Sequence, residues 1–142
     1  MNNQILNSIV KKATLSLDEL LMANKAELDE IPISPGVYLA YNKEGKVIYV
    51  GKAVNLKRRI LEDHRGGDEK MSTSTLRRSI SKIYNIAPGR PVRDWIRDNC
   101  SFAYIAIDEH DLRDLVEALA VMYFRKSGSS LLNFYRGERR EI

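Results

Sequence analysis

Two stretches of this 142-residue chain carry side chains that could do chemistry. Residues 36–60, GVYLAYNKEGKVIYVGKAVNLKRRI, combine tyrosines, glycines and several Lys/Arg side chains. Glu117 is the only charged residue in residues 115–124, LVEALAVMYF. An ionised carboxylate in an apolar helix is costly unless it is paired or binds a metal. The residue types therefore predict either a metal ligand at Glu117 or a buried salt bridge from Glu117 to an arginine.

Positive charge is concentrated in one third of the chain. Residues 51–98 carry 12 Lys/Arg and six Asp/Glu, whereas the formal net charge of the whole chain is +4. A concentrated basic excess favours a polyanion partner, because neutralising phosphates releases their condensed counterions. The alternative is a charged face that is merely solvated.

Length and composition indicate one globular domain over residues 1–142. Hydrophobic residues make up 44% of the chain and charged residues 30%. No run approaches the roughly 18 apolar residues of a membrane helix, and the N-terminus lacks the apolar core of a signal peptide, so we expect a cytoplasmic protein without a membrane partner. Cys100 is the single cysteine, which excludes an intramolecular disulfide and a Cys-rich zinc site.

Hydrophobic periodicity predicts how these residues are positioned. The first 34 residues read as a helical extension of one or two helices, the second of which would be capped by Ser16. A β-hairpin follows, with Tyr38 and Ala40 on one face and Val37 and Leu39 on the other. Asn55 would cap a helix that runs to about His64. Further elements are expected as helices at 74–84, 92–99 and 111–126 and a strand at 102–108.

A GVY that precedes a YVG by eleven positions, followed by a capped basic helix, resembles the GIY-YIG nuclease family. The match through PGVYLAYNKEGKVIYVGKAVNLKRRI is most similar to the N-terminal nuclease domain of the bacterial nucleotide-excision-repair endonuclease subunit. The resemblance implies an α/β (α+β) domain with a central three-stranded antiparallel sheet flanked by helices. It also implies hydrolysis of nucleic-acid phosphodiesters with a divalent metal.

The resemblance also implies a set of catalytic residues. Tyr38 and Tyr49 fall on the two tyrosines of the family. Glu117 falls on its metal-binding glutamate, where one Mg2+ or Mn2+ ion would bind. The remaining matches are Lys52, Arg59 and Asn133. Each of these residues also has an ordinary explanation, such as cross-strand aromatic packing for the tyrosines or a turn for Asn133.

The chemistry explains the residue types. A phosphodiester hydrolase must activate water and neutralise the charge that builds in the transition state. Arg59 would present a planar fork of donors to phosphate oxygens. A tyrosine with a pKa of about 10 is a poor base at neutral pH, so Lys52, the metal or a hydrogen-bonded tyrosine pair would have to lower that pKa. The residues leave open which tyrosine is the base.

This chain departs from the family pattern at two points. Four residues after Arg59, relatives often place a tyrosine or histidine, but this chain has Asp63, followed by His64. We predict a catalytic role for His64 if the helix end frays or tightens. The second departure is a basic helical insertion at 65–99, in which Trp95 is expected to be a core residue rather than a base-stacking platform. The predicted nucleic-acid-binding residues are Lys52, Arg58, Arg77, Arg78, Lys82, Arg90 and Arg93.

Together these features predict a divalent-metal-dependent endonuclease that hydrolyses DNA. One alternative is a nucleic-acid-binding module of the same fold with little or no catalytic activity. Another is an RNA-directed nuclease. The sequence leaves the oligomeric state and the biological role open.

Overall fold

A computed structural model of the chain describes residues 3–65 and 74–133. The helix α1 (Gln4–Met22) and a 3-10 turn η1 (Leu28–Glu30) precede the strands β1 (Gly36–Tyr41) and β2 (Val47–Ala53). Then follow η2 (Arg58–His64), α2 (Thr75–Ile83), α3 (Arg90–Asn99), β3 (Ser101–Ala106) and α4 (His110–Lys126). The strands form an antiparallel sheet in the order β2-β1-β3, which confirms the predicted α+β fold.

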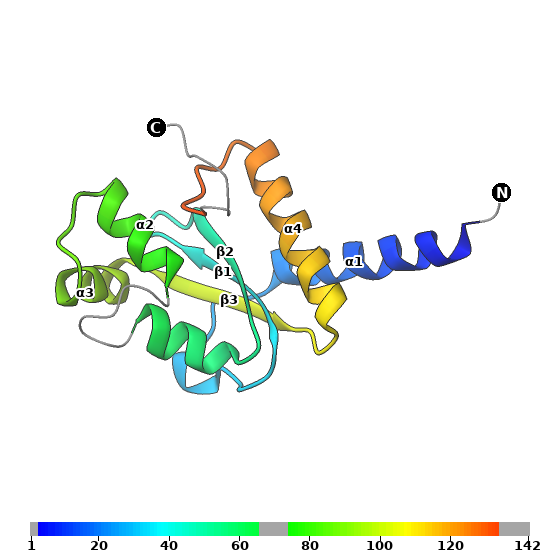
Figure 1. Cartoon of the computed structure of the whole chain (residues 1–142), viewed down its shortest axis with the longest axis horizontal. Helices are drawn as coiled ribbons and strands as arrows, with labels where there is room; N and C mark the ends of the chain where they lie inside the picture. The colour runs from blue at the N-terminus through cyan, green and yellow to red at the C-terminus, as the bar shows by residue number, and fades with distance from the viewer. Residues whose placement is uncertain (1–2, 66–73, 134–142) are drawn as a thin grey trace.

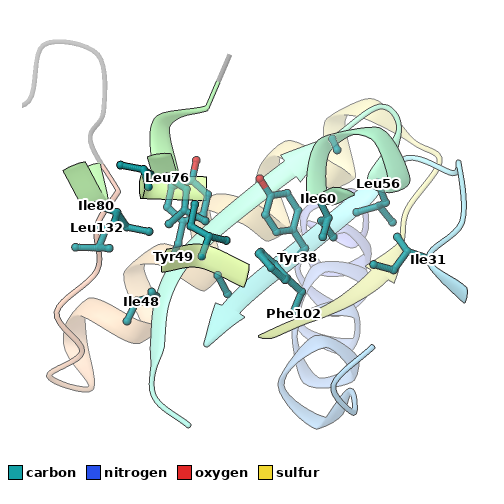
Figure 2. Packing of buried hydrophobic residues seen from close by; sticks show 14 residues of the cluster. Ile31, Tyr38, Ile48, Tyr49, Leu56, Ile60, Leu76, Ile80, Phe102 and Leu132 are labelled. Atoms are coloured by element: carbon teal, nitrogen blue, oxygen red, sulfur yellow. The ribbon is translucent and has the colours of Figure 1, made fainter. Parts of the chain in front are cut away.

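Helices cover both faces of this sheet. In Figure 1, α1 and α4 lie on one side of the strands and α2 and α3 lie on the other. Val37 and Leu39 pack with residues of α1 and α4, such as Leu20 and Val116. The alternating residue Tyr38 packs on the opposite face with residues of η2, α2 and α3, as Figure 2 shows for several of them. The predicted alternation along β1 is therefore confirmed.

A β-bulge lies near the start of β2. Ala40 pairs with Tyr49, whereas the next residue, Tyr41, pairs with Val47, so Ile48 is an extra residue in β2. As a result the consecutive residues Ile48 and Tyr49 both pack into the core that contains Tyr38. Bulges re-aim side chains in this way. The two tyrosines share one face of the sheet because Ala40, the partner of Tyr49, lies two residues from Tyr38 on β1 (Figure 2).

Two glycines allow close approach inside the sheet. Gly51 lies opposite Tyr38 on the neighbouring strand, and a Cβ atom at Gly51 would overlap the Tyr38 ring. A Cβ atom at Gly36 would overlap the carbonyl oxygen of Ile105 in β3. Both glycines lie within strands, so their function here is steric and not only to serve bends at strand ends.

The N-terminal residues form one helix, and the predicted cap at Ser16 is wrong. Ser16 lies inside α1, which continues to Met22. No glycine or proline interrupts this stretch, and buried Ala13 and Leu20 hold it against the rest of the protein on both sides of Ser16. Within residues 3–65 and 74–133, no helix is both long and apolar enough to cross a membrane.

Candidate active site

Tyr38 lies in the buried part of the candidate site. Its side chain is 1% exposed, and the centroids of the Tyr38 and Tyr49 rings are 6.2 Å apart. The Tyr38 hydroxyl lies 2.5 Å from Nε2 of His64. The structure therefore brings His64 of η2 next to Tyr38 of β1 and Tyr49 of β2.

His64 reaches this position because the helix widens at its end. Asn55 caps the helix as predicted, since its Oδ1 accepts from the backbone N–H of Arg58 at 3.0 Å. From Arg58 to His64 the helix is a π-helix, and the Arg65 N–H donates to the Ile60 carbonyl five residues earlier, at 3.1 Å. We expected fraying or tightening at this end, and that expectation is wrong. The wider turn rotates His64 inward, as π-helical insertions at functional sites do.

Asp63 fills the position where relatives often carry the aromatic residue. Its Oδ2 lies 3.4 Å from Nη1 of Arg59, one helical turn earlier. The charge of the Arg59 guanidinium also lowers the pKa values of Tyr38, Tyr49 and His64, so Arg59 lies near the same cluster.

Ser74 completes the surroundings of His64, and sequence reasoning missed it. Its Oγ lies 2.6 Å from Nδ1 of His64 and accepts from the backbone N–H of Arg77 at 3.0 Å as the N-cap of α2. The sequence signal was a serine directly before an apolar helical pattern. The side chain of the next residue, Thr75, lies close enough to Tyr49 to oppose the rise of the Tyr49 pKa. The start of α2 therefore touches both His64 and the tyrosine pair.

Burial sets the protonation of these groups. The pKa of His64 falls to about 3, first because of burial and then because of the nearby Arg59 and Arg77. His64 is therefore a neutral imidazole at physiological pH. Burial raises the pKa of Tyr38 well above its usual value, and burial followed by the Glu117 charge raises that of Tyr49. The expected lowering of a tyrosine pKa is therefore wrong for the protein alone, because desolvation disfavours the phenolate.

A second group of side chains comes from α4 and the outer strand. Nζ of Lys52 donates to Oδ1 of Asp114 at 2.6 Å, in a half-exposed ion pair. This bond lowers the pKa of Asp114. Lys52 affects the pKa of neither tyrosine, because alternation along β2 directs it to the α4 face. The expected help from Lys52 to a tyrosine is therefore wrong. Asp114 was missed, although it lies one helical turn before Glu117.

Glu117 is partly buried, and burial raises its pKa, with Lys52 opposing and Asp114 adding to the shift. Across the described ranges, no Lys or Arg lies within ion-pair distance of its carboxylate, so the alternative of a buried salt bridge to arginine is not what the structure shows. One side of α4 is open, with Met122 and Tyr123 exposed. The apolar residues around Glu117 are therefore not all buried.

Asn133 acts on the strand rather than facing the cluster. Its Oδ1 accepts from the Val50 N–H at 3.0 Å, and its Nδ2 donates to the Val50 carbonyl at 2.6 Å. Because β2 is an edge strand, these bonds occupy its outer backbone groups next to Tyr49 and Gly51. These bonds give Asn133 a structural role on β2, and its predicted catalytic role stays a prediction.

The predicted nucleic-acid-binding residues divide into two groups. One arginine is buried. Arg77 is 1% exposed and donates to the Gly89 carbonyl at 3.1 Å. Its predicted contact with nucleic acid is wrong, because the Arg77 side chain lies on a buried side of α2 and not on its exposed side. The exposed members are Lys52, Arg58, Arg78, Lys82 and Arg90, and Arg93 is partly buried beside Asp94.

Comparisons with known proteins agree with this geometry. Residues 34–88 match a family model described as the UvrC-like GIY-YIG domain. The UvrABC system protein C of Mycoplasma mycoides is 35% identical over 112 residues, which cover 79% of this chain and 16% of that protein. The protein of the same name from Koribacter versatilis is 53% identical over 54 residues, or 37% of this chain and 9% of that protein. The chain thus spans less than a fifth of the length of these relatives. The chain carries a GIY-YIG domain of the UvrC-like type.

Proposed function

We propose that this protein is a divalent-metal-dependent endonuclease that hydrolyses phosphodiester bonds in DNA. The observation that carries this proposal is the hydrogen bond between the buried Tyr38 hydroxyl and the neutral His64, beside Arg59 and a carboxylate with no cationic partner among the described residues. The match to a UvrC-like nuclease domain supports it.

The contact between Tyr38 and His64 provides a route for a proton. A neutral imidazole whose Nδ1–H donates to Ser74 Oγ leaves Nε2 as an acceptor for the Tyr38 hydroxyl. As the attacking water gives a proton to the phenol oxygen, the phenol proton moves to Nε2. The phenol then never carries a full charge. Because the pKa of His64 is about 3 in the protein alone, the imidazolium would form only against the negative charge of the attacked phosphate.

Arg59 and Tyr49 would bind and orient the phosphate. The Arg59 guanidinium would donate to nonbridging oxygens, exchanging its contact with Asp63 for the substrate. Among the charged groups near Tyr49, Glu117 has the largest effect on its pKa. Tyr49 would therefore orient the water or the phosphate between itself and Glu117.

The chemistry of Glu117 fits a magnesium or manganese ion. Magnesium keeps several waters and takes one or two carboxylates plus phosphate oxygens, and the described residues contain no cluster of three or more His, Cys, Asp or Glu ligands. Glu117 would hold the ion, with Asp114 as a neighbour already engaged by Lys52. When bound, the ion would supply charge neutralisation at the phosphate and the leaving oxygen.

The test is incubation of the purified protein with plasmid DNA, structured DNA oligonucleotides and RNA, each with magnesium and with a chelator. We expect DNA cleavage only with magnesium. Arg59→Ala should lose cleavage but still bind DNA. Binding without cleavage by the wild type would point to a binding module, and cleavage of RNA alone would replace the proposed substrate.

The metal assignment has its own variant. Glu117→Gln removes the charge and keeps the shape, so cleavage should be abolished at any magnesium concentration. Because burial raises the pKa of Glu117, the neutral glutamine should leave the protein at least as stable at pH 7. Asp114→Asn is the matched control on the same helix. Full activity of Glu117→Gln would defeat the assignment.

A further inference from the structure

A cleft outside the candidate active site lies between the β1–β2 turn and helices α2 and α3. Its volume is about 430 Å3, and its walls include Lys43 and Lys46 of the turn, Tyr84 after α2, and Trp95 and Asn99 of α3. Neither the predicted catalytic set nor the family match gives this cleft a function.

Two stacked aromatic rings form one wall. The centroids of the Tyr84 and Trp95 rings are 5.0 Å apart, and the ring planes are tilted by 26°. Trp95 packs against the core below the sheet, as the sequence predicted, whereas Tyr84 is 45% exposed. Trp95 is thus the fixed inner ring, and Tyr84 is the outer ring with accessible surface.

The end of α2 holds Tyr84 in this position. Asn85 adopts a left-handed conformation with φ of 54°, and the Ile86 N–H donates to the Ser81 carbonyl at 3.0 Å. This is the pattern of a Schellman motif, which ends a helix and fixes the direction of the chain. The Ser81 hydroxyl adds a bond to the Ile86 carbonyl at 2.7 Å. The exposed ring is therefore held by a rigid backbone.

Polar groups around the stack are suited to a nucleotide. Lys43 and Lys46 are exposed cations beside one acidic residue, Glu44. Oδ1 of Asn42 accepts from two backbone N–H groups of the turn, and Nδ2 of Asn99 donates to the Trp95 carbonyl. In the part of the chain that is described, Nδ2 of Asn42 donates no hydrogen bond and Oδ1 of Asn99 accepts none. One donor and one acceptor thus remain for the edge of a base.

We infer that this cleft binds an unpaired nucleobase of a DNA strand, which stacks on the outer face of Tyr84. Every base has a π-face, so aromatic platforms beside cations bind single strands with little sequence preference. The two lysines would contact the phosphates that flank the base. A base inside a duplex is already stacked on its neighbours, so the cleft would favour DNA with a single-stranded region. The inference rests on the proposed function only in taking DNA as the substrate.

Trp95 makes a direct test practical, because it is the only tryptophan of the chain. A chelator prevents metal-dependent cleavage, and the tryptophan fluorescence of the full chain is titrated with a single-stranded DNA oligonucleotide and with the matched duplex. The single strand should change the Trp95 fluorescence to saturation, and the duplex should have a weaker effect. No change at saturating single strand would overturn the inference.

Variants identify the stacking ring. Base stacking contributes about 1–3 kcal/mol, so Tyr84→Ala should weaken single-strand binding by about 5- to 150-fold, while Tyr84→Phe should retain it. Tyr123→Ala is the matched control, because Tyr123 is 46% exposed on α4 and stacks edge-on against Phe124. Wild-type affinity of Tyr84→Ala would also overturn the inference.

The outcomes separate the two proposals. A wild type that cleaves DNA, together with a Tyr84→Ala variant that binds normally, would remove the stacking site and leave the nuclease. A wild type that cleaves nothing but binds single strands through Tyr84 would do the reverse. Thermal unfolding of Tyr84→Phe and Tyr84→Ala shows that a lost affinity does not come from a lost fold.

Discussion

His64, at the end of η2, connects strand β1 and the start of helix α2 through its two ring nitrogens. Nε2 faces the Tyr38 hydroxyl and Nδ1 faces the Ser74 hydroxyl, at 2.5 and 2.6 Å. The imidazole also stacks in parallel on Phe102, with centroids 6.2 Å apart. A histidine that is held on both nitrogens and on one face has a fixed ring orientation. Two experiments on single residues follow from this.

The first concerns acid stability. The pKa of His64 is about 3 in the folded protein, below the ordinary histidine value of about 6.5. The unfolded chain therefore binds the proton first as the pH falls. Stability is fully present above about pH 6.5 and is lost toward pH 3, with a slope approaching about 1.4 kcal/mol per pH unit. The measurement is the free energy of unfolding against pH for wild type and His64→Phe. Because carboxylates titrate in both proteins, the difference between the two curves isolates His64, and parallel curves would show that His64 is not buried neutral.

The second concerns Ser74, a positioning residue that acts through His64. Ser74→Ala removes the Nδ1 partner and the helix cap, so we expect a loss of about 1 kcal/mol of stability. We also expect kcat to fall by about tenfold or more, with KM little changed, because the imidazole loses the bond that orients it. Ser74→Thr keeps the hydroxyl and should restore both values. A Ser74→Ala enzyme with normal kcat and reduced stability would leave Ser74 as a helix cap only.

At the scale of an element, the start of helix α2 and its exposed side differ in what they contact. Its first residues, Ser74 and Thr75, contact His64 and Tyr49, while its exposed side carries Arg78 and Lys82. The buried Arg77 lies between α2 and the start of α3, where it donates to the Gly89 carbonyl. A DNA backbone that contacts the exposed side of α2 would thus touch the same rigid helix that orients His64.

Replacing the exposed cations and, separately, the buried arginine should distinguish DNA binding from stability. The double variant Arg78→Ala, Lys82→Ala should fold normally and weaken DNA binding, and the slope of log K against log salt should fall by up to about 2, since each lost phosphate contact removes about 0.9. Arg77→Ala is the control on the adjacent position. It should lose on the order of 2 kcal/mol of stability, because buried polar partners are left without it. An unchanged salt slope in the double variant would show that this surface does not contact phosphates.

At the scale of the whole molecule, the segment after α4 returns to the sheet and covers the outer edge of β2. Asn133 bonds to both backbone groups of Val50, a residue 83 positions earlier, and the Leu132 N–H donates to the Ile48 carbonyl at 2.6 Å. These bonds cover the outer edge of β2, the strand that carries Tyr49 and Lys52. The edge strand is thereby held from both sides.

Asn133→Ala should therefore act on activity through stability. Loss of two bonds to a buried backbone costs about 1–3 kcal/mol, so the thermal unfolding midpoint should fall. Cleavage measured well below that midpoint should fall less than in Arg59→Ala, because no group that faces the phosphate is removed. Ser127→Ala, which loses one exposed bond to the Tyr123 carbonyl at the end of α4, is the control. Loss of cleavage equal to that of Arg59→Ala without destabilisation would mean that Asn133 faces the substrate.

The sequence by itself determined the elements and most of the candidate site, because those depend on local patterns. Alternation predicted the hairpin and the two faces of β1, and the spacing of tyrosines, Arg59 and Glu117 predicted a GIY-YIG domain. Only the tertiary structure decided the π-helical turn that brings His64 to Tyr38, the contacts of Ser74 and Asp114, and the burial of Arg77. Each of these depends on distant segments packing together, which leaves no regular spacing in the chain. The same burial decided the direction of the tyrosine pKa values. Lys52 was expected to lower a tyrosine pKa, whereas desolvation raises both values and acts only once the chain has folded around the tyrosines.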